Sequence, residues 1–85
     1  MTTIALQFWG GARAAAGVDR EEWEARSVAE ALDLAAAARS DPRFDRVVAI
    51  CTILVDGAVL GPAGLHAPRD APVTVECLPP FAGGS

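Results

Sequence analysis

Lysine and tyrosine are absent from this chain, and cysteine and histidine are scarce. All seven basic residues are arginines, so no internal amine can accept an isopeptide bond, which excludes a polymer branched through its own side chains. Two cysteines and one histidine are too few ligands for a zinc site or an iron–sulfur cluster, which also excludes a ferredoxin. Cys51 and Cys77 lie in apolar runs without CxxC spacing. We expect them to be small buried hydrophobes, and a disulfide between them stays open.

No apolar run approaches the length that crosses a bilayer, and the start MTTIALQF lacks the basic residues of a secretory leader. A net charge of −4 with dispersed arginines is a poor match for nucleic acid and suits a basic protein surface. We therefore expect a cytoplasmic protein that binds neither nucleic acid nor membrane. Its 85 residues suffice for one small core.

Two strands and a helix are predicted in the first half. Residues 3–9 alternate, with Ile4, Leu6 and Phe8 on one face, and residues 21–26 alternate again. Residues 12–17 read as a connector, with a helical turn left open, so the two strands should form an antiparallel pair. Ser27 and Glu30 have the spacing of a capping box, which predicts a helix that stops near Ser40, before Pro42. Residues 43–49 fit either a short helix or an irregular segment.

The second half predicts strands at residues 50–55, 58–60 and 72–78. Asp56-Gly57 is a hairpin signal between the first two, and residues 61–70 read as a loop. This order predicts an α+β domain of the β-grasp (ubiquitin-like) class, a mixed sheet of four to five strands with one main helix packed across it. The first and last strands should lie side by side at its centre. We assign residues 1–80 to the domain and residues 81–85 to a flexible diglycine tail.

The tail combines one large apolar residue, Phe81, with the diglycine Gly83-Gly84 after a rigid proline pair. Without side chains, glycine backbone can thread a narrow site, and residues 81–84 would reach roughly 13 Å when extended. The chemistry that such an end offers is acyl activation of a terminal glycine. The chain shows no phosphate-binding loop and no nucleophile–base pair of its own, so we expect no enzymatic activity, no bound cofactor and no metal.

Four stretches carry a resemblance to a known family. They are IALQFWGGARAAAG, SVAEAL, LVDG and VECLPPFAGG, which together cover essentially the whole chain. The chain resembles the ubiquitin-like sulfur carriers, and most closely the small, sulfur-carrying subunit of molybdopterin synthase.

The resemblance implies that Gly84 is adenylated by a ubiquitin-activating-type enzyme, which uses ATP, and is then converted to a thiocarboxylate. The thiocarboxylate would enter the large subunit of molybdopterin synthase and supply sulfur for the molybdenum cofactor. Gly83 and Ala82 would thread the partner's site. Carriers that serve thiamine, cysteine or a secondary metabolite remain alternatives, as does a ubiquitin-like modifier or interaction module.

Two further features concern partners. Trp9, Leu54, Leu78 and Phe81 could form one apolar interface beside the tail, although Trp9 could equally be covered by the chain's own loops. Ser85 follows Gly84 and occupies the carboxyl group that the chemistry needs. A protease could trim it, it could be a residue left from expression, or the carrier could be inactive, and the last is the least favoured.

Overall fold

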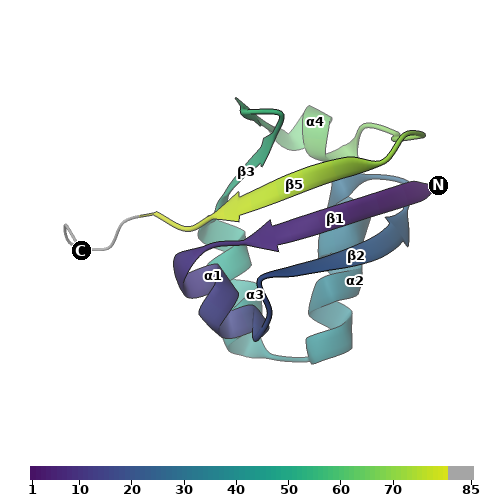
Figure 1. Cartoon of the computed structure of the whole chain (residues 1–85). Helices are drawn as coiled ribbons and strands as arrows, with labels where there is room; N and C mark the ends of the chain where they lie inside the picture. Colours follow the sequence, from purple (N-terminus) through teal and green to yellow (C-terminus); the bar gives the residue numbers. More distant parts are fainter. Residues whose placement is uncertain (81–85) are drawn as a thin grey trace.

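A computed structural model of the chain describes residues 1–80, and Figure 1 shows one sheet with helices behind it and at its ends. The five strands are β1 (Thr2–Phe8), β2 (Arg20–Ala25), β3 (Thr52–Val55), β4 (Ala58–Val59) and β5 (Val73–Leu78). Their order across the sheet is β2-β1-β5-β3-β4. The central pair β1 and β5 is parallel, and the other pairs are antiparallel. The predicted β-grasp sheet, with the first and last strands together at the centre, is confirmed.

Four helices accompany the sheet: α1 (Gly10–Ala16), α2 (Val28–Arg39), α3 (Pro42–Ile50) and α4 (Pro62–His66). The longest, α2, is the main helix expected, and it packs on β1 and β2. Residues 12–17, for which the sequence left a helical turn open, are helical as far as Ala16, in a helix that already begins at Gly10. The segment 61–70 was predicted as a loop, and it contains the helix α4. Within residues 1–80, no helix is long and apolar enough to cross a membrane.

Local signals explain where α2 and α3 begin. The Ser27 hydroxyl accepts from the Glu30 N–H (3.0 Å), and the Glu30 carboxylate reaches back to the Arg26 N–H (2.7 Å). This is the predicted capping box, with its second bond one residue earlier than usual. Asp41 caps α3 through the Arg43 N–H (2.9 Å), and Pro42 occupies the first turn, where its missing N–H costs nothing.

The predicted strand at residues 50–55 begins two residues too early. Ile50 is the last residue of α3, and Cys51 caps that helix. Residues 43–49, which the sequence left open between helix and irregular structure, are helical. The apolar run that continues into β3 hides this boundary, because periodicity alone does not separate a buried strand from the end of a helix.

The core lies between the inner face of the sheet and the helices. Ile4, Leu6 and Phe8 of β1 are fully buried, as the alternation of residues 3–9 predicted. Val28, Ala31 and Ala35 cover them from α2, where the small alanines permit close approach of the helix to the sheet. The other buried residues of this cluster are Ala12, Ala25, Phe44, Ile53, Val55, Val75 and Cys77.

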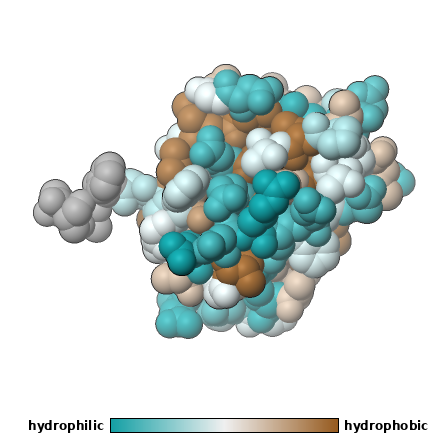
Figure 2. Space-filling view, in the orientation of Figure 1, coloured by the Kyte–Doolittle hydropathy of each residue, from teal (hydrophilic) through white to brown (hydrophobic). Residues whose placement is uncertain are grey.

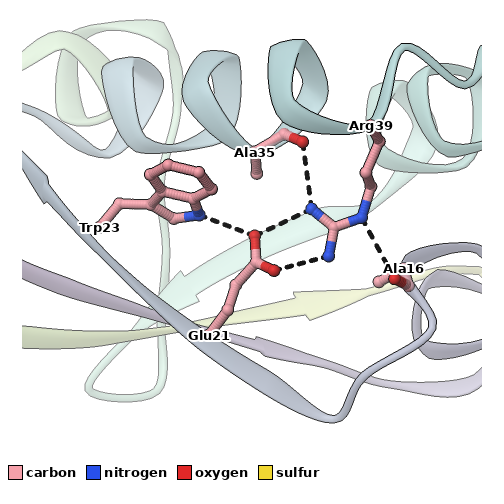
Figure 3. Close-up of polar contacts among 5 residues, drawn as sticks. All are labelled: Ala16, Glu21, Trp23, Ala35 and Arg39. Carbon is pink, nitrogen blue, oxygen red and sulfur yellow. Dashed lines mark hydrogen bonds and ion pairs between the residues drawn. The ribbon is translucent and has the colours of Figure 1, made fainter.

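An ion pair between Arg39 and Glu21 lies at the edge of this core, and Figure 3 shows its hydrogen bonds. Two Arg39 nitrogens donate to the two Glu21 oxygens at 2.6 and 2.9 Å, and the Trp23 indole donates to the same carboxylate at 2.7 Å. Arg39 also donates to the carbonyl oxygens of Ala16 (3.2 Å) and Ala35 (3.0 Å). These bonds lower the pKa of Glu21 and raise that of Arg39, chiefly through their mutual hydrogen bonds.

Aromatic rings complete the surroundings of Arg39. Its guanidinium carbon lies 4.5 Å from the centroid of Phe44 and 5.6 Å from that of Phe8, and the two rings meet edge to face. Cation–π contacts of this kind add to the ion pair. Arg39 therefore joins α1, α2, α3, β1 and β2 at the end of the sheet where β1 and β5 finish.

Candidate protein-interaction site at the end of strand β5

Figure 1 shows no helix in front of the outer face of the sheet, the face away from the core, at β1, β5 and β3. Strand register places side chains of this face in rows, because alternate residues point to the same side. Gln7 pairs with Glu76, Glu76 with Leu54, and Leu54 with Val59. One row therefore runs from a polar residue through a carboxylate to two apolar residues.

Apolar side chains gather on this face near the end of β5. We define the outer patch as Trp9, Leu54, Leu78 and Val59. Trp9 is 44% exposed, Leu78 37% and Val59 67%, while Leu54 is partly buried. Figure 2 shows apolar surface on the β3–β4 side of this face and hydrophilic surface toward β1 and β2. Exposed apolar surface of this kind is a common mark of a protein-binding site.

The structure places three of the four predicted interface residues on one face. Trp9 follows β1 with extended backbone (φ −122°, ψ 153°), so the alternation carries its side chain to the side of Gln7. At 44% exposed, its side chain is only partly covered by the described residues of the chain. Val59 belongs to the same patch and was missed, although its pairing with Leu54 follows from the Asp56-Gly57 turn. The role of these residues as an interface remains a prediction.

The end of β5 is fixed before the tail begins. The Trp9 N–H donates to the Cys77 carbonyl at 3.2 Å, which holds the ends of β1 and β5 together. Gly10 has φ +49°, and a Cβ there would lie 3.4 Å from the Pro79 ring. A side chain at Gly10 would thus be strained by its backbone, and its Cβ would lie in van der Waals contact with the proline. The predicted tail residues Phe81, Ala82, Gly83 and Gly84, together with Ser85, lie outside the described residues.

The side chains around this end offer little reactive chemistry. Cys51 and Cys77 are free thiols, and burial raises the pKa of Cys77 to about 12 and that of Cys51 in the same direction. Thiols of this kind are protonated at neutral pH and are poor nucleophiles. Residues 1–80 contain no cluster of three or more His, Cys, Asp or Glu side chains that could hold a metal ion. The one histidine, His66, is exposed at the end of α4.

No protein-family model and no curated protein sequence matches the chain. Solved structures do match along almost its full length. Small archaeal modifier protein 1 from Methanosarcina acetivorans is 19% identical with a TM-score of 0.80, covering 99% of this chain and 98% of its own. A Pyrococcus furiosus protein described as molybdopterin converting factor, subunit 1, is 20% identical with a TM-score of 0.75, covering 95% of this chain and 100% of its own.

A third match is a chain in the complex of subunits 1 and 2 of molybdopterin-converting factor from Helicobacter pylori. It is 18% identical with a TM-score of 0.65, and the match covers 96% of this chain and 99% of that one. At such identities the likeness concerns the fold. The chain has the β-grasp fold of ubiquitin-like molybdopterin-converting subunits and small archaeal modifier proteins, as the resemblance in its sequence implied.

Proposed function

We propose that this chain is a sulfur carrier that acts as the small subunit of molybdopterin synthase. The observation that carries the proposal is the end of β5. A central strand, held to β1 through Trp9, leads into Pro79-Pro80 beside the outer patch, and the sequence continues as Phe81-Ala82-Gly83-Gly84. The likeness to molybdopterin converting factor, subunit 1, supports the same function.

The proposed chemistry needs only a carboxylate on the carrier. An oxygen of the Gly84 carboxylate attacks the α-phosphorus of ATP, pyrophosphate leaves, and an acyl adenylate forms. A sulfur nucleophile then attacks the acyl carbon and displaces AMP, which takes one carboxylate oxygen with it. When the nucleophile is hydrosulfide, Gly84 then carries a thiocarboxylate directly. When it is a persulfide on a donor protein, the product is an acyl disulfide, and attack of a thiol on the donor's sulfur breaks the S–S bond, leaving the thiocarboxylate and a disulfide between that thiol and the donor. The adenylating enzyme supplies catalysis and uses the ATP, so the carrier is a non-catalytic partner.

Intact-mass measurement tests the proposal directly. A chain ending at Gly84 is incubated with the adenylating enzyme of the ubiquitin-activating type from its own organism, ATP and a sulfur donor. We expect a mass increase that corresponds to the exchange of one oxygen for one sulfur. If the mass does not change while a known carrier is thiolated in the same mixture, the chain is not a sulfur carrier.

The serine after the diglycine, Ser85, leads to a second prediction. A chain ending at Ser85 presents the serine carboxylate in place of that of Gly84, so we expect no thiolation at Gly84 until a protease removes the serine. The two chains, ending at Ser85 and at Gly84, are compared in the same assay. Equal thiolation of both without loss of the serine would contradict this requirement.

The proposal also specifies which protein accepts the sulfur. We infer that the large subunit of molybdopterin synthase binds the outer patch and takes up the tail, as the Helicobacter pylori complex of subunits 1 and 2 suggests. Thiamine, cysteine or a secondary metabolite would need another acceptor protein. Recovery of the large subunit with the carrier, and formation of molybdopterin from its pterin precursor by the pair, would support this acceptor against the others.

The likeness to small archaeal modifier proteins supports a second candidate, a ubiquitin-like modifier. In that case Gly84 would form an isopeptide bond with a lysine of a target protein. This chain could act as the donor only, because it contains no lysine. Proteomic detection of target peptides that bear the Gly83-Gly84 remnant would favour this function over sulfur delivery.

A further inference from the structure

Glu76 occupies the middle of the outer face. It lies on the central strand β5, in register with Gln7 of β1 and Leu54 of β3. Its side chain is partly buried. Leu78, which belongs to the outer patch, lies two residues further along the same strand. Among residues 1–80, no hydrogen bond or ion pair satisfies the Glu76 carboxylate.

The polar side chains in the same cross-strand row as Glu76 are engaged elsewhere. The Gln7 amide nitrogen donates to the Asp19 carbonyl at 3.0 Å, toward the β2 side. Arg20 is aligned with Gln7 in the next strand, but its guanidinium lies 3.2 Å from the Glu22 carboxylate. On the other side of the row, Leu54 and Val59 offer no donor. Glu21 behaves differently on the opposite face of the sheet, where Arg39 satisfies both of its oxygens.

An unpaired carboxylate is tolerated on this face only while water reaches it. A protein that takes up Gly84 must approach the end of β5, because residues 81–84 span roughly 13 Å at most. Glu76 is two residues from the end of that strand, so the same protein would cover it. Covering a charge without a partner is costly, and the loss must be offset by an opposite charge with good hydrogen-bond geometry.

We propose that the adenylating enzyme presents an arginine that pairs with Glu76 inside an otherwise apolar contact with the outer patch. The inference rests on the proposed function, since it assumes that such an enzyme takes up the tail. Arginine fits better than lysine because its planar guanidinium binds a carboxylate through two bonds and gives up water more readily. Glu76 then determines which activating enzyme the carrier serves.

The test measures adenylation kinetics with carriers ending at Gly84. The adenylating enzyme of the same organism is supplied with ATP, pyrophosphate release is followed, and the concentration of the carrier is varied. We expect Glu76→Gln to raise KM for the carrier at least about tenfold with kcat unchanged, since truncating one partner of a buried charge pair weakens binding strongly. Glu76→Asp keeps the charge and should recover part of the affinity.

Glu24→Gln is the matched control. It removes the same charge from the outer face, but on the edge strand β2, where Glu24 bonds to Thr3. We expect its KM to stay within about twofold of the wild-type value, because exposed charges contribute little. Thermal unfolding should show Glu76→Gln to be as stable as wild type or more so, since no bond within residues 1–80 is lost.

The outcomes separate the two proposals. If the wild-type carrier is not adenylated, the proposed function fails and the pairing fails with it. If the wild-type carrier is adenylated and Glu76→Gln has an unchanged KM, only the pairing is overturned. Equal effects of Glu76→Gln and Glu24→Gln would also overturn it, because they would indicate general charge attraction instead of a specific pair.

Discussion

The Glu21 carboxylate lies at the edge of the core, where both of its oxygens accept hydrogen bonds from Arg39. The two side chains are only 20% and 15% exposed. A bidentate pair in such a place differs from an ordinary surface ion pair, since little water competes for its hydrogen bonds. Trp23 donates to the same carboxylate, so three strong donors hold one side chain in place.

We predict that Glu21→Gln lowers the free energy of unfolding by about 2 kcal/mol at neutral pH, in the range for hydrogen bonds to charged groups. The pKa of Glu21 lies below its ordinary value of 4.5, chiefly because Arg39 donates to it. The contribution of the Glu21 charge to the free energy of unfolding is therefore complete above pH 4.5 and is lost as the pH falls through the folded-state pKa. Urea denaturation of both proteins across this range should show the difference shrinking in acid.

Glu22→Gln is the control at this scale. Glu22 pairs with Arg20 on the exposed face, where the side chains are 57% and 46% exposed, and we expect a loss below about 0.5 kcal/mol. A gap between wild type and Glu21→Gln that persists unchanged in strong acid would show that the charge of Glu21 does not cause the stabilisation.

At the scale of elements, the start of α2 allows a test of the capping box that the sequence predicted. Ser27→Ala removes the acceptor of the Glu30 N–H and should cost about 1 kcal/mol, whereas Ser27→Asn keeps a side-chain oxygen and should cost much less. The midpoint of urea denaturation measures both. Equal losses in the two variants would mean that packing of residue 27, and not its hydrogen bond, stabilises the start of α2.

The helices and strands divide into those that local sequence determines and those that it does not. The start of α2 and the turn at Asp56-Gly57 depend on residues a few positions apart, and both were predicted correctly; the turn has the two positive φ values that such a hairpin requires. The end of α3 was not predicted correctly. Asp41-Pro42 does mark its start, but Ile50 and Cys51 continue an apolar run into β3, and only tertiary packing decides where the helix stops.

At the scale of the whole molecule, the candidate site combines residues that are distant in sequence. Alternation and the predicted strand order were enough to place Trp9, Leu54 and Leu78 on one face. They were not enough to single out Glu76, because its lack of a partner depends on where Gln7 and Arg20 direct their side chains. The pairing of Arg39 with Glu21 was equally hidden, since it joins two elements through the topology alone.

The domain boundary gives a prediction for the molecule as a whole. The core and all five strands lie within residues 2–78, and Pro79 contacts the domain beside Gly10. A chain that ends at Pro80 should therefore keep its free energy of unfolding within about 0.5 kcal/mol of the full chain, as expected for changes away from the core. The same truncation removes Gly84 and should abolish adenylation completely.

Denaturation and pyrophosphate release, measured on one preparation, would separate folding from function. A stability loss well above that value would show instead that residues 81–85 pack against the domain, and the assignment of the tail as a separate functional segment would then be wrong.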